Sequence, residues 1–277
     1  MPRVAPSSFR FRLILALASS LPGGFCAGRD VTTAWELVAR HLPGDALAQL
    51  GAASADPSRE AKLARAVAQM DSQPVTEARL QQVAEQLTTL ARGDDEIAAA
   101  AAYLTGRLYQ VHLPTPDPSR AAHEYEQLAA RHPGSYWAQL GLVKLALLVL
   151  YVLPEPTEPA ARLAVAVALL PRLTAPELRR DLHIVLGRAK LFHGRPGTEV
   201  LEQLLAADRI GGLSGVSRAD LQLQIAELSR REDNWAQARD YFSRFLAENE
   251  VDARAYQVKE KLAEIAAHLR TGKAARP

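Results

Sequence analysis

The chain has 277 residues, of which 48% are hydrophobic and only 6% aromatic, and its 33 basic residues nearly balance 31 acidic ones. This apolar content excludes a largely disordered chain, and the abundance of Ala and Leu favours helices over strands. The near-neutral charge excludes the broad basic surface of a general nucleic-acid-binding protein. The single cysteine, Cys26, excludes a disulfide within the chain.

Residues 1–27 have the composition of a secretory signal peptide. An arginine-rich start precedes a short apolar run from Leu13 to Leu21, and Ala27 and Gly28 supply small residues for cleavage. The run is shorter than the roughly 20 residues that span a bilayer. We therefore expect export into the periplasm or the medium of a bacterium, with an uncleaved N-terminal anchor or a misassigned start as the alternatives.

Cys26 raises the alternative of a bacterial lipoprotein, in which a cysteine after the signal peptide carries the lipid anchor. A lipobox needs a small residue directly before the cysteine and an aliphatic residue three positions before it, where this chain has Phe25 and Gly23. These departures argue against a lipid anchor.

Residues 31–92 predict an N-terminal helical region. Helical apolar spacing runs from 31 to 50 and is interrupted at Pro43, and Ser58 is a candidate N-cap for the next helix. Residues 76–90 then predict an amphipathic helix with Leu80, Val83, Leu87 and Leu90 on one face.

A long helix with small residues at 98–102 is expected over 94–111, followed by a proline-rich connector and a helix over 119–131. The stretch 141–153 is almost entirely apolar. It is shorter than the roughly 20 residues of a membrane span, so we interpret it as a buried helix and expect no transmembrane helix in the mature chain.

The remaining elements are helices in close succession. They are expected over 160–170, 175–192, 198–207, 217–231, 234–247 and 252–269. The glycine-rich stretch 209–215 predicts either a loop where the helical array bends or a hinge. The last helix has a polar outer face and predicts a C-terminal cap, and residues 271–277 predict a short disordered tail.

The most informative spacing lies between residues 223 and 250. Small residues occupy the positions where two antiparallel helices would cross, and large residues lie beside them. The pattern consists of Ile225, Ala226, Trp235, Ala238, Phe242 and Phe245. The same register recurs at Thr105, Gly106, Tyr109, Ala121, Tyr125, Leu128 and Pro133, and more weakly at Leu186 and Gly187. This pattern resembles the tetratricopeptide repeat (TPR), a helix–turn–helix unit of about 34 residues.

The resemblance implies an all-α fold, a right-handed solenoid of TPR-like antiparallel helix pairs over 94–270. It is strong at 220–250, good at 102–133 and poor at 134–175, and the region 31–92 does not match it. The stretch 125–135 is also similar to exported bacterial repeat proteins of the cell envelope.

In the TPR family, ligands lie along a groove built by the first helix of each repeat. The resemblance therefore implies a non-enzymatic scaffold or adaptor that binds a protein or peptide partner in the cell envelope. The candidate groove residues are Tyr103, Arg107, Ile184, Arg188, Leu223 and Glu227. Arg107 and Arg188 fall at the same repeat position and are candidates to pair with acidic groups of a partner, with ordinary solvated arginines as the alternative. The Lys and Asn residues that clamp chaperone tails are missing here.

No catalytic or metal-binding motif emerges from the sequence, so we expect no cofactor and no metal site. The acidic cluster 94–96 opens a predicted helix, where negative charge offsets the helix dipole. The competing hypothesis is a helical-repeat hydrolase of the envelope, or its accessory subunit, acting on polysaccharide or peptidoglycan. Such an enzyme needs convergent carboxylates. Glu124 and Glu126 are candidates by residue type alone, because side chains two residues apart on a helix diverge.

Overall fold

The computed structural model describes residues 29–52 and 58–274. The predicted signal peptide, Cys26 and the last three residues of the predicted tail lie outside the described residues. The described part is helical and contains no strand, so the predicted all-α class is confirmed.

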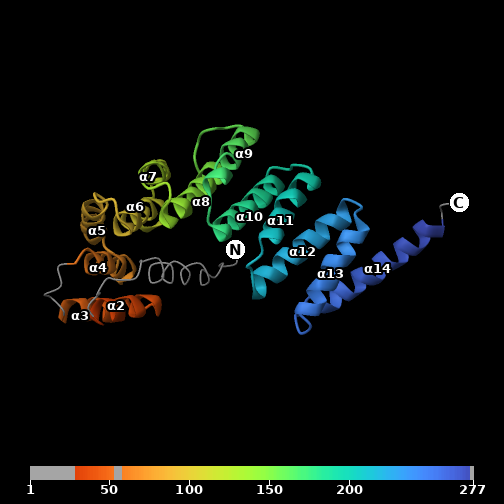
Figure 1. The fold of residues 1–277 in the computed structure, drawn as a ribbon, viewed down its shortest axis with the longest axis horizontal. Coiled ribbons are helices and arrows are strands. Elements are labelled where there is room, and N and C mark those ends of the chain that lie inside the picture. Colours follow the sequence, from red (N-terminus) through yellow and green to blue (C-terminus); the bar gives the residue numbers. More distant parts are fainter. Residues whose placement is uncertain (1–28, 53–57, 275–277) are drawn as a thin grey trace. The chain divides into compact units, whose positions relative to one another are not determined.

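The described residues form thirteen α-helices and two short helical turns of other types. The bounds are α2 (Arg29–Ala39), α3 (Pro43–Ala52), α4 (Arg59–Asp71), α5 (Glu77–Leu90), α6 (Glu96–Arg107), η1 (Leu108–His112), α7 (Pro118–Arg131), α8 (Tyr136–Tyr151), α9 (Pro159–Val167), η2 (Leu170–Arg172), α10 (Pro176–Phe192), α11 (Gly197–Ile210), α12 (Gly215–Arg231), α13 (Trp235–Glu248) and α14 (Ala255–Ala274). Figure 1 shows them along the chain. Because α14 continues to Ala274, residues 271–274 of the predicted tail are helical.

Many helices begin at a side chain that accepts a hydrogen bond from a free backbone N–H of the first turn. This N-cap contact stabilises a helix by about 1 kcal/mol. The capping residues are Ser58, Thr76, Asp95, Asp117, Ser135 and Asn234. Asp95 belongs to the acidic cluster 94–96, and its carboxylate accepts from the Ala98 amide at 2.8 Å.

The chain divides into two compact units that meet in sequence at Pro154 and Glu155. Unit 1 contains helices α2 to α8, and unit 2 contains α9 to α14. The predicted border near residue 93 falls inside unit 1, where α5 packs against α6.

Helix α6 is the centre of unit 1. Its residues 98–106 are all buried, because α4, α5, α7 and α8 pack around it. The run of alanines at 98–102 lets these neighbours approach closely. An aromatic cluster lies where they meet, with the Tyr103 ring centroid 5.9 Å from that of Tyr125 and 5.5 Å from that of Trp137.

The helix predicted over 94–111 changes type at its end. A π-helical turn, η1, follows α6 and carries Gln110 to the Tyr125 hydroxyl, which donates to its side-chain oxygen at 2.9 Å. A π turn is a rare local widening of a helix that apolar periodicity does not reveal.

The apolar stretch predicted as a buried helix is the core of α8. The helix begins earlier than predicted, at Tyr136, because Ser135 caps it, and it ends at Tyr151. Residues 137–146 and 148–150 are buried. Among the described helices, none combines the length and the apolarity that a bilayer crossing needs.

In unit 2, consecutive helices from α10 to α14 pack against one another, as Figure 1 shows. The core between them includes Ala226, Ala238, Phe242 and Phe245, all 0% exposed. Gly187 lies at the crossing of α10 and α11, where an added Cβ would be 2.8 Å from a methyl carbon of Leu204. A larger residue at this crossing would therefore have to displace the Leu204 side chain.

The glycine-rich stretch is a loop held by a buried arginine. Arg180 on α10 is 2% exposed, and its guanidinium donates to the Gly211 carbonyl at 3.0 Å and to the Asp181 carboxylate at 2.7 Å. Gly211 and Gly212 have φ of 74° and 77°, a region that favours glycine. The charged side chain therefore fixes the passage from α11 to α12.

Replacing Ala238 with Leu should lower the free energy of unfolding by about 1–3 kcal/mol, because the larger side chain overpacks a fully buried position. Urea titration followed by circular dichroism measures the change. Ala236→Leu is the matched control on the exposed side of α13 and should leave the midpoint unchanged. Equal effects of the two substitutions would contradict the assignment of Ala238 to the helix crossing.

Candidate functional site

A groove in unit 2 is the strongest candidate site. It has a volume of about 350 Å³ and is lined by α10, α12 and α14, with α11 beneath. Its lining residues are Gly187, Arg188, Leu191, Val200, Leu204, Leu223, Gln224, Glu227, Leu228, Arg231, Arg254, Gln257, Val258 and Lys261. We call this the unit 2 groove. Its apolar residues come from all four helices, so its floor is continuous with the core.

The charged residues of the unit 2 groove are four cations and one carboxylate. Lys261 donates to Glu227, and Arg230 contacts the same carboxylate at 3.5 Å. The charge of Glu227 is therefore offset by its neighbours, and the groove keeps a positive balance.

Arg254 is held at the edge of the unit 2 groove. It donates to Asp220 at 2.6 Å and to Asp252 at 2.8 Å. These carboxylates raise the pKa of Arg254, and the bonds donated by Arg254 lower the pKa of Asp252 to about 2. Arg254 is thus a fixed cation that already has partners.

Two arginines of the unit 2 groove have no such partner. Arg188 and Arg231 are exposed, and neither has a hydrogen bond or ion pair with any described residue. The amides of Gln224 and Gln257 also have no described partner. The groove therefore presents two guanidinium groups and two amides beside apolar side chains.

The structure brings together three of the six residues predicted for partner binding. Arg188, Leu223 and Glu227 line the unit 2 groove. Ile184 is partly buried and packs against the hydrophobic core of unit 2. The sequence analysis did not predict Arg231, which lies on α12 four residues after Glu227, the last predicted groove residue of that helix.

The other two predicted residues lie in unit 1 and are occupied by internal contacts. Tyr103 is 0% exposed, so the expectation that it faces a partner is wrong, because α7 and α8 cover α6 on that side. Burial raises the pKa of Tyr103. Arg107 is half-buried and donates to Gln110 at 2.8 Å, so it does not share the open setting of Arg188.

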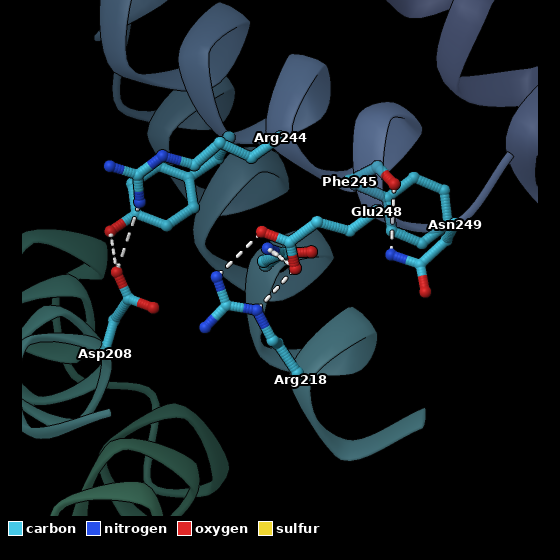
Figure 2. Close-up of polar contacts among 8 residues, drawn as sticks. Asp208, Arg218, Arg244, Phe245, Glu248 and Asn249 are labelled. Atoms are coloured by element: carbon cyan, nitrogen blue, oxygen red, sulfur yellow. Dashed lines mark hydrogen bonds and ion pairs between the residues drawn. The ribbon is translucent and has the colours of Figure 1, made fainter. Parts of the chain in front are cut away.

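A second polar cluster links α11, α12 and α13 (Figure 2). Tyr241 donates to Asp208 at 2.7 Å, and burial, with this bond, raises the pKa of Tyr241 to about 12. Arg218 donates to Glu248, as Figure 2 shows, and the N···O distance is 2.7 Å. This bond lowers the pKa of the Glu248 carboxyl. Every charge in this cluster has a partner from a neighbouring helix. We therefore interpret it as a structural tie between helices.

Paired carboxylates are missing from three cavities that the described residues form. The unit 2 groove contains only Glu227, a cavity of about 350 Å³ beside α7 contains only Glu124, and one of about 750 Å³ between α4 and α5 contains only Glu85. Glu124 pairs with Arg120 at 3.4 Å. These cavities do not provide the two facing carboxylates that glycoside hydrolysis uses.

Comparison of the sequence with protein-family models finds no match, and comparison with curated proteins finds none either. The TPR resemblance therefore depends on the residues of this chain alone.

Proposed function

We propose that this chain is a non-enzymatic scaffold that binds a segment of a protein partner in the unit 2 groove. The observation that supports the proposal is the combination of an apolar floor with Arg188 and Arg231 at its edge, neither of which has a described partner. Binding sites in proteins typically combine an apolar lining with a few convergent polar groups.

The proposal includes a TPR-like, right-handed arrangement of the helix pairs. Two ion pairs support it, one between α12 and α14 and one between α12 and the residue that precedes α14. Glu227 pairs with Lys261 and Asp220 with Arg254, and both pairs join residues 34 positions apart. This separation equals the TPR period of about 34 residues, at which successive first helices lie side by side. The unit 2 groove is then the surface formed by three successive first helices.

Replacing Arg188 with Ala should weaken partner binding and leave the free energy of unfolding within about 0.5 kcal/mol of the original value, because the side chain is exposed and unpaired. Binding is measured as the amount of each protein that the immobilised full chain captures from a bacterial envelope extract, quantified by mass spectrometry. Urea titration measures stability on the same preparations.

Arg239→Ala is the matched control, because Arg239 is exposed on α13 and outside the unit 2 groove. It should capture the same proteins as the unmodified chain. An equal loss with both variants would show that capture does not involve the groove. Unfolding of the Arg188→Ala variant would show that the helix register is wrong.

We also propose export to the bacterial envelope through a cleaved signal peptide. The support is the arginine-rich start and the short apolar run in residues 1–27. N-terminal sequencing of protein recovered from a periplasmic extract should begin near residue 27. An intact Met1 in cytosolic material would contradict the proposal.

A further inference from the structure

We infer that the unit 2 groove recognises an acidic peptide segment in which an aliphatic side chain is flanked by Asp or Glu. This inference rests on the proposed function and specifies the chemistry of the partner. It is carried by the charge balance of the groove, by the exposure of its apolar residues and by its free amides.

The apolar part of the groove suits a small aliphatic side chain. Leu191 at the end of α10 is 53% exposed, which is high for a leucine beside a core, and Leu223 is half-buried. A partner side chain placed here would cover both residues and continue the core formed by Leu204 and Val258. Removing this apolar surface from water favours association.

The charges of the groove determine which groups of the partner can lie beside its aliphatic side chain. Glu227 already has Lys261 and Arg230, and Arg254 already has Asp220 and Asp252. The positive charge that has no carboxylate partner in the groove is therefore that of Arg188 and Arg231. A guanidinium binds a carboxylate through two parallel hydrogen bonds, so carboxylates of the partner fit these positions and ammonium groups are repelled.

The free amides favour a peptide over a fatty acid, which would also combine a carboxylate with an apolar chain. Gln224 and Gln257 each offer a donor and an acceptor within the groove, and neither has a described partner. A peptide backbone provides complementary N–H and C=O groups at every residue. An alkyl chain provides none, and burying these amides against it would leave them without hydrogen bonds.

Selection from a library of random peptides displayed on phage tests the inference. The immobilised full chain is the target, and the variant carrying both Arg188→Glu and Arg231→Glu is used for counter-selection. Both arginines are exposed, so the variant should keep the original melting curve. The enriched peptides should contain an aliphatic residue with Asp or Glu beside it and should be depleted in Lys and Arg.

A synthetic peptide from the enriched set, labelled for fluorescence anisotropy, gives the affinity. Arg188→Glu should weaken its binding about tenfold or more, as expected for losing one hydrogen-bonded charge pair. Arg239→Glu is the control and should change the affinity little. Replacing the acidic residues of the peptide with Lys should abolish binding, and added salt should weaken it.

Different failures have different meanings. Enrichment of peptides without acidic residues would overturn this inference and leave the groove as a peptide site. No enrichment over the double variant would contradict both this inference and the proposed function.

Displacement of the peptide by dodecanoate at equal concentration would assign the groove to a lipid-like carboxylate. A concentration-dependent dimer that Arg188→Glu dissociates would assign it to a second copy of the chain. Either result would overturn the inference.

Discussion

Replacing Phe242 with Ala should lower the free energy of unfolding of unit 2 by about 3–5 kcal/mol, a large effect for a single substitution. Phe242 is 0% exposed in the core shared by α11, α12, α13 and α14. The Lys261 ammonium also lies 5.8 Å from its ring centroid. The substitution removes buried apolar area and leaves a cavity. The helices around this cavity are held by neighbours on both sides, so they close it only in part.

Urea titration monitored by circular dichroism measures this loss. Phe192→Ala is the matched control, because Phe192 is 73% exposed at the end of α10, and it should cost less than about 1 kcal/mol. A loss from Phe242→Ala no greater than that of the control would mean that the assigned core of unit 2 is wrong.

Replacing Gly106 with Ala should destabilise unit 1 by about 1–3 kcal/mol, although Ala is the better helix former by up to about 1 kcal/mol. A Cβ at Gly106 would lie 2.4 Å from a ring carbon of Tyr125, closer than atoms approach without displacement. The ring cannot move away freely, because it is buried and its hydroxyl donates to Gln110. Steric overlap therefore outweighs helix propensity.

Two comparisons test this explanation. Gly51→Ala on α3 has open space around the added methyl group and should be neutral or stabilising. In a Tyr125→Leu background, Gly106→Ala should cost less than it does alone, because the ring it meets is gone. Equal costs in both backgrounds would show that the contact with Tyr125 does not cause the loss.

The sequence predicted most of the helices because their signals are local. Ser58 and Asn234 cap the helices that follow them, and apolar spacing marks the buried faces. The unit 2 groove was predicted in part, since Arg188, Leu223 and Glu227 follow from the repeat register. Register identifies a position on a helix and does not reveal how many other helices cover it, which is why Tyr103 was misassigned.

The remaining differences come from contacts between residues distant in sequence. Burial of Arg180 depends on a carbonyl that becomes available only when the chain turns at Gly211. Arg231 lies four residues after Glu227 on α12, and it has no described partner while Lys261 and Arg230 contact that carboxylate. Composition and spacing contain neither fact, because each depends on which groups the fold brings together.

The Arg180 contact with the glycine loop also restricts how this protein can diverge. Loss of Arg180 would leave the Gly211 carbonyl without its donor, and a side chain at Gly212 would place a Cβ 3.0 Å from the Arg180 guanidinium. Both changes are unfavourable. Homologues should therefore retain the arginine and both glycines together, which makes residues 180, 211 and 212 a heritable signature for recognising distant members of this lineage.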